Sequence, residues 1–286
     1  MTTLQTLDER LGAGLSRPQA SLPVRAQVQT GLALIHRDVA VVLHSLPEYV
    51  VRATMQPALF AFVFAYVFPR IGQGIGGTRN GGQFATVLLP GLMASTLIFQ
   101  GIFNVALPLV QEFISREIED RAMSPTPVEI VALCKIISGA IQGAISGLLV
   151  IPIVWIASGF AASVDWSHPL LLITIVPIGA VAGSALGLLL GTVVEPRQIN
   201  LLFSLLVLPL TLLGCVYYPW ATLSALRWLQ IGVLVNPVVY LSEGLRATLV
   251  GRVEHMSLFA VYGLLLGASI AMTYLGVRFF RKRVIN

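Results

Sequence analysis

Charged residues are scarce in this chain. They make up 11% of its 286 residues, whereas hydrophobic residues make up 56%. Soluble domains carry about 25% charged residues, so this composition excludes an ordinary soluble protein and predicts an all-α integral membrane protein. Cysteine is almost absent as well. Cys134 and Cys215 both fall in or beside apolar segments, which predicts packing residues and no disulfide framework.

Motifs for catalytic and nucleotide chemistry are also missing. The sequence has no G-x-x-x-x-G-K-[ST] loop, no H-E-x-x-H, no G-x-S-x-G and no paired-cysteine metal motif. We therefore expect no enzyme activity, no catalytic residue, and no metal or cofactor in this chain. The net charge of +5 does not predict a nucleic-acid partner, because Lys and Arg in a membrane protein mark the cytoplasmic side.

Six apolar segments dominate the chain. A helix needs about 20 apolar residues to cross the hydrocarbon core. The segments predict six transmembrane helices, at 53–68, 84–110, 130–157, 169–193, 199–217 and 257–279. With the N-terminus inside, the inner connections hold thirteen of the 18 Lys and Arg residues. Both termini are therefore predicted to be cytoplasmic.

Two segments outside these spans have patterns of their own. Residues 24–46 repeat apolar side chains at three- and four-residue steps, which predicts an amphipathic interfacial helix; an N-terminal extension of span one is the alternative. Residues 218–251 are too apolar for an exposed loop and too interrupted to span, which predicts an outer re-entrant helical hairpin between spans five and six. Residues 1–23 lack an apolar signal-peptide core and are expected to form a flexible cytosolic tail.

A charged stretch, EFISREIEDRAMSPTP, separates the second and third spans. Such a stretch cannot lie in hydrocarbon. It predicts a short cytosolic helix, within residues 111–129, that a soluble partner could push; a solvated turn is the alternative. The candidate docking residues are Glu112, Arg116, Glu117, Glu119, Asp120 and Arg121.

Ionisable side chains are almost missing from the span interiors. Lys135 is the exception, and it lies close enough to the inner end of span three to extend to the interface. Ion-coupled carriers commonly place ionisable groups at mid-membrane, so the driving force is expected to come from another chain. Neutral residues that could line a path, or instead form packing hydrogen bonds, are Gln100, Asn104, Asn200 and Thr211.

Glycine recurs every fourth residue in two of the predicted spans. Small residues at this spacing share one helix face and let two helices approach closely. The face permits either static packing or a sliding contact. The residues are Gly139, Gly143 and Gly147 in span three, and Gly179, Gly183, Gly187 and Gly191 in span four.

The order of these features resembles the six-span permease subunit of ABC-2-type transporters, the group that includes daunorubicin-resistance and nodulation lipo-oligosaccharide exporters. The helix at 24–45 looks like that family's connecting helix. REIEDRAMSPTPVEIVALCKII is similar to its coupling helix, and NPVVYLSEGLR is similar to its outer re-entrant region. The resemblance makes residues 24–286 one ABC-2-type transmembrane domain.

The resemblance implies a permease subunit of an ATP-driven exporter in a bacterial inner membrane. It implies two copies of a separate cytosolic ATPase, which would hold ATP and Mg, and a second permease chain, identical or a paralogue. The path would carry an amphiphile, such as a drug, lipid or glycolipid. Membrane lipid is an expected partner, and the expected roles are multidrug or lipid efflux and antibiotic resistance. The resemblance also implies an outer cap formed by Trp220, Trp228, Asn236, Pro237, Tyr240, Glu243 and Arg246. Glu243 and Arg246 are three residues apart, so they could pair on one helix face.

Two other function classes stay open on the sequence alone. An ion-coupled carrier or channel acting alone predicts charges buried within the spans. An intramembrane lipid-modifying enzyme predicts clustered ionisable residues at one interface. A P-loop ATPase encoded beside this gene would separate both classes from the transporter subunit.

Overall fold

The computed structural model describes residues 23–71, 81–115, 127–160, 162, 164–166, 168–195, 198–250 and 255–285. Within them every regular element is a helix, as the sequence predicts. Among the described helices, four are long and apolar enough to cross a membrane. They are Phe84–Ile114, Val128–Ala157, Pro169–Val193 and Leu258–Val284.

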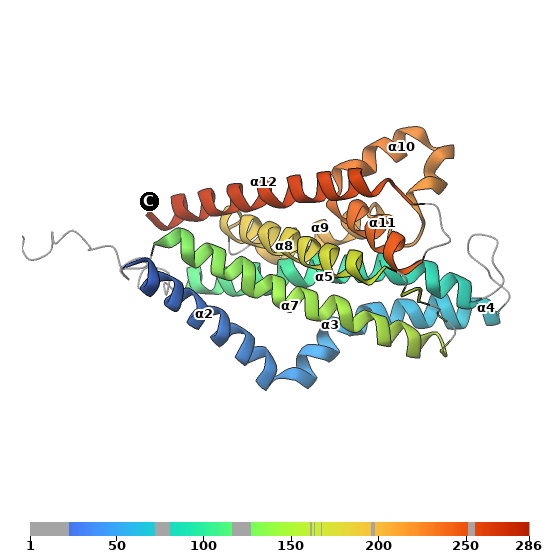
Figure 1. The fold of residues 1–286 in the computed structure, drawn as a ribbon, viewed down its shortest axis with the longest axis horizontal. Helices are drawn as coiled ribbons and strands as arrows, with labels where there is room; N and C mark the ends of the chain where they lie inside the picture. The colour runs from blue at the N-terminus through green and yellow to red at the C-terminus, as the bar shows by residue number, and fades with distance from the viewer. Residues whose placement is uncertain are drawn as a thin grey trace, which may run out of the picture.

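The first two described helices, α2 (Val24–His44) and α3 (Leu46–Ala61), meet at Ser45. Pro47 lies in the first turn of α3, where a missing backbone N–H costs no intrahelical hydrogen bond. The helical run then continues through the π-helical η1 (Phe62–Val67) into α4 (Phe68–Arg70). In Figure 1, α2 and α3 form a V whose corner points away from the other helices.

The centre of the bundle is α5 (Gly81–Ile114), which packs against both α7 (Val128–Ala157) and α8 (Pro169–Val193). Its 34 residues span about 51 Å at 1.5 Å per residue. The hydrocarbon core of a bilayer is about 30 Å thick, so α5 extends beyond it. Apolar side chains such as Leu97 and Ile98 are completely buried or nearly so, and they form the core shared by these three helices.

The glycine faces of α7 and α8 both lie against α5. A Cβ atom added at Gly183 would lie 2.8 Å from the carbonyl oxygen of Ile98, and one added at Gly187 would lie 2.8 Å from Cα of Ile102. On α7, a Cβ atom at Gly143 would lie 3.2 Å from the carbonyl oxygen of Leu97. The glycine repeats therefore bring three backbones into close contact.

The next helix along the chain, α9 (Ile199–Leu212), has 14 residues and is about 21 Å long. Short helices follow: η4 (Trp220–Ala225), α10 (Arg227–Gly232), η5 (Val233–Val235) and α11 (Pro237–Leu249). All of α11 is buried, and it contacts α5, α8 and α12. The last helix, α12 (Leu258–Ile285), packs along α8 and ends where α7 begins, at the left of Figure 1.

Candidate functional site

A cavity of about 860 Å³ lies between α2, α3, α5 and α7. Concave sites with a few converging polar groups are where proteins usually bind ligands. The wall of this one brings together charged side chains from all four helices, within a bundle whose core is apolar. These charged residues are Arg37, Asp38, Arg52, Glu112 and Lys135.

An ion pair between α5 and α7 lies at one end of the cavity. The Lys135 ammonium is 2.8 Å from the carboxylate oxygens of Glu112, and each side chain is only 12% exposed. A cation in an apolar bundle needs such a partner, because the loss of hydration is otherwise uncompensated. Lys135 therefore has a protein partner, and Glu112 points into the cavity wall rather than offering an open docking surface.

Two further contacts fix α2 and α3 as walls of the cavity. Asp38 on α2 accepts a hydrogen bond from Ser138 Oγ on α7 at 3.1 Å, and it pairs with Arg37 at 2.9 Å. The Tyr49 hydroxyl on α3 donates to the Gln142 carbonyl of α7 at 2.7 Å. Both segments are thus tied to α7 by polar contacts rather than by apolar packing alone.

The Tyr49 hydroxyl also joins α3 to α5. It accepts a hydrogen bond from Asn104 Nδ2 at 3.4 Å, and it lies 2.5 Å from Ser146 Oγ. Asn104, predicted as a path residue, lines the cavity beside this junction. Its amide therefore contacts the Tyr49 hydroxyl at the cavity wall.

A second, smaller cavity of about 40 Å³ continues from the first toward α9. The two cavities share lining residues from α3 and α5: Arg52, Gln56, Gln100 and Phe103. The smaller cavity reaches Thr211, whose hydroxyl donates to the Val207 carbonyl at 2.7 Å. Three of the predicted path residues, Gln100, Asn104 and Thr211, thus line adjoining cavities. Asn200 belongs to α9, and its side chain lies outside the described part of the chain.

Aromatic rings line the far end of the smaller cavity. Phe60 and Tyr217 both face it, with ring centres 5.5 Å apart. Phe64 lies 6.0 Å from the same tyrosine ring. The adjoining cavities therefore run from an ion pair at one end to packed aromatic rings at the other.

The predicted outer cap is held together by a buried ion pair. Glu243 and Arg246 of α11 are both completely buried and lie 2.5 Å apart. Glu243 also accepts hydrogen bonds from the backbone N–H groups of Trp220 at 2.9 Å and Met256 at 3.1 Å. Arg246 donates to the Cys215 carbonyl at 3.1 Å. The pair therefore joins the segments before and after α11.

The other predicted cap residues support the same segment. Asn236 caps α11 by accepting from the Val238 N–H at 3.0 Å, and its amide donates to the Leu210 carbonyl of α9 at 3.0 Å. Pro237 forms the first helical position. The Tyr240 hydroxyl donates to Leu234, and the Trp220 indole donates to Gln230. Trp228, by contrast, is 74% exposed.

Most of the predicted docking stretch lies outside the described residues. Arg116, Glu117, Glu119, Asp120 and Arg121 lie outside the described residues. The described chain ends at Ser115, just after α5, and resumes at Pro127, just before α7. The stretch therefore connects the two helices that carry the Glu112–Lys135 pair.

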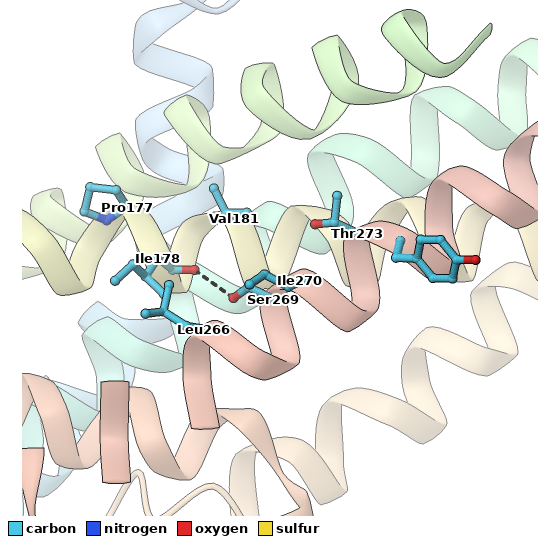
Figure 2. Close-up of a pocket in the computed structure, with 8 residues that line it drawn as sticks. Pro177, Ile178, Val181, Leu266, Ser269, Ile270 and Thr273 are labelled. Atoms are coloured by element: carbon cyan, nitrogen blue, oxygen red, sulfur yellow. Dashed lines mark hydrogen bonds between the residues drawn. The ribbon is translucent and has the colours of Figure 1, made fainter. Parts of the chain in front are cut away.

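A different groove, of about 460 Å³, lies between α8 and α12. Figure 2 shows Pro177, Ile178 and Val181 of α8 facing Leu266 and Ile270 of α12. Ser269 donates across the groove to the Ile178 carbonyl at 3.4 Å. The groove holds no charged side chain, and its walls are two of the candidate membrane spans.

The described residues contain no group of three or more His, Cys, Asp or Glu side chains positioned to hold a metal ion. Both cysteines are buried and unpaired. The two adjoining cavities and the ion pair of α11 each bring together several polar side chains of the described bundle.

Several residues of the main cavity were not predicted from the sequence. Arg52 and Gln56 stand one helical turn apart on α3 and face the cavity together. The four-residue spacing of two polar side chains in an apolar stretch was the available signal. The contribution of α2, through Arg37 and Asp38, had no such signal because it depends on the bend at Ser45.

Comparison with known proteins relates this chain to one family and to several named proteins. A family model described as "ABC-2 type transporter" matches residues 31–250. The chain is also 28% identical, over 225 residues, to the protein named Inner membrane transport permease YadH from Escherichia coli strain K12, covering 78% of this chain and 85% of that protein. The protein of the same name from Shigella flexneri matches equally well.

Proposed function

The chain belongs to the ABC-2 type transporter family, and from this premise we propose that it is the membrane-spanning permease subunit of an ATP-driven exporter. The substrate passes along the adjoining cavities between α2, α3, α5, α7 and α9. The observation that carries this proposal is the series of polar side chains lining those cavities, inside a bundle with an apolar core. Related proteins named as inner membrane permeases support a multi-pass position in a bacterial inner membrane.

The energy for transport comes from a separate chain. The sequence contains no phosphate-binding loop, so this chain is not the subunit that binds ATP. In the proposed transporter, ATP and Mg bind to two copies of a cytosolic ATPase. The charged stretch between α5 and α7 docks on that ATPase through Arg116, Glu117, Glu119, Asp120 and Arg121. Both flanking helices line the main cavity, so a push on this stretch moves the cavity walls.

The full topology has six spans with both termini cytoplasmic. The four long apolar helices are joined by the run from α3 to α4 and by α9. Residues 24–46 lie in the inner interface, and 218–251 form the outer re-entrant cap. Exposed apolar side chains on α3 and α9, such as Met55, Leu59, Leu205 and Leu208, are available to face lipid or a second permease chain, identical or a paralogue.

The substrate is an amphiphile, such as a drug, a lipid or a glycolipid. The main cavity mixes charged residues with apolar ones such as Val42 and Leu107. That combination suits a molecule with a polar head and an apolar body.

The test is co-purification of the tagged full chain with the P-loop ATPase encoded beside its gene, followed by ATP hydrolysis in lipid. Glu117→Arg/Asp120→Arg reverses two charges of the docking stretch and is expected to abolish both association and coupled hydrolysis. Asp8→Arg/Glu9→Arg makes the same charge change in residues 1–23 and is expected to retain both.

Each result decides between the function classes. ATPase binding by the wild type that is lost only in the docking-stretch variant supports the transporter subunit. A wild type that binds no ATPase, with or without lipid and nucleotide, contradicts it and favours a carrier, channel or enzyme acting alone.

A further inference from the structure

We propose that the main cavity binds the anionic phosphate headgroup of a membrane amphiphile, and that Arg52 is the residue that pairs with the headgroup charge. This inference rests on the proposed function, in which the cavity is part of the transport path. It adds the charge and the chemical class of the ligand that enters the cavity.

The charges of the cavity leave one cation uncompensated. Arg37 pairs with Asp38 at 2.9 Å, and Lys135 pairs with Glu112 at 2.8 Å. The fifth charged residue, Arg52, has no carboxylate partner among the described residues. Its guanidinium carbon lies 6.0 Å from the ring centre of Tyr49, which is at the limit of a cation–π contact. The cavity therefore carries a net charge of one positive unit, located at Arg52.

Amide side chains with unused hydrogen-bonding capacity surround this cation. Gln56 lies one turn after Arg52 on α3, and Gln100 faces them from α5. Among the described residues, neither glutamine side chain has a hydrogen-bond partner. Two amide donors beside a guanidinium match the several acceptor oxygens of a phosphate group. A guanidinium also binds phosphate in a bidentate geometry that an ammonium cannot provide.

The remaining wall of the cavity fits the apolar part of an amphiphile. Val41 and Val42 of α2 and Leu107 of α5 line the same space, and Val41 is 63% exposed. The volume of about 860 Å³ lies within the usual range for ligand sites. The site therefore offers one cationic centre, neutral hydrogen-bond donors and an apolar side within a single cavity.

The first test measures binding by the purified full chain in phosphatidylcholine nanodiscs, using fluorescent phosphatidylglycerol as the anionic probe and fluorescent phosphatidylcholine as the zwitterionic one. Wild type is expected to prefer the anionic probe. Arg52→Gln is expected to weaken phosphatidylglycerol binding by at least about tenfold, because hydrogen bonds to charged groups are the stronger ones, and to leave phosphatidylcholine binding unchanged.

Matched variants separate charge from folding. Arg52→Lys keeps the charge and is expected to recover part of the lost affinity. Arg278→Gln removes an exposed charge from α12, outside the cavity, and is expected to change binding by less than about twofold. Equal affinity of wild type for both probes, or undiminished phosphatidylglycerol binding by Arg52→Gln, would overturn the proposal.

A second arm separates cargo from a resident lipid and this proposal from the proposed function. With the ATPase and ATP present, movement of phosphatidylglycerol between leaflets that is lost in Arg52→Gln identifies the amphiphile as cargo. Binding without movement identifies a resident lipid on the same headgroup site. Arg52→Gln is expected to co-purify with the ATPase as the wild type does. If the wild type itself binds no ATPase but still binds phosphatidylglycerol through Arg52, only the proposed function is contradicted.

Discussion

Glu243 and Arg246 lie one helical turn apart on α11 and form an ion pair that is completely buried. Between them they hold the backbone at Trp220, Met256 and Cys215. Three segments that are separated in sequence therefore depend on one pair of side chains.

Removing one member of this pair is expected to destabilise the protein strongly. Glu243→Ala leaves Arg246 buried without its carboxylate, which costs about 3–5 kcal/mol, and frees two backbone N–H groups. Thermal unfolding in detergent, followed by size-exclusion recovery, measures the loss. Glu254→Ala removes a carboxylate that lies outside the described residues and serves as the control. Similar melting of Glu243→Ala and wild type would show that the pair does not hold the cap.

The pair between Glu112 and Lys135 is expected to show coupling. Lys135→Met leaves a carboxylate in a largely buried position, whereas Glu112→Gln/Lys135→Met leaves no charge. The double variant is therefore expected to lose less unfolding free energy than the two single variants lose together, by about 1–3 kcal/mol. A double-mutant cycle of unfolding free energies provides the measurement, and additive values would contradict the coupling.

Gly183 is expected to tolerate no larger residue. Gly183→Ala places a Cβ atom 2.8 Å from the Ile98 carbonyl oxygen, and backbone atoms cannot move aside as a flexible side chain can. A loss of about 1–3 kcal/mol is expected from such overpacking. Gly263→Ala on α12 meets no atom within 4 Å and is the matched control, expected to unfold at or slightly above the wild-type temperature.

Asn236 performs two tasks that substitutions can separate. Asn236→Asp keeps an oxygen that caps α11 but loses the N–H bond to Leu210, whereas Asn236→Ala loses both contacts. The alanine variant is expected to lose about 0.5–2 kcal/mol more than the aspartate variant, the usual value of an N-cap. Hydrogen exchange at the first turn of α11 reports the cap directly, and equal protection in both variants would argue against it.

The sequence singled out three polar residues that the structure places along the adjoining cavities, but it did not predict their surroundings. Gln100, Asn104 and Thr211 stood out because each interrupts an apolar helix, and they line adjoining cavities. Glu112 stood out equally as part of a charged stretch, yet it points inward to Lys135. A one-dimensional pattern gives the polarity of a residue but not the neighbour that will face it.

The sequence alone determined that the described chain is helical and apolar and that glycine faces allow close packing. Both follow from local chemistry: the hydrogen bonding of the backbone and the size of the side chains. Only the tertiary structure decided that α2 bends back to form a cavity wall and that Arg52 has no carboxylate partner among the described residues. Those facts depend on contacts between residues far apart in the chain, such as Asp38 with Ser138, and no local pattern specifies them.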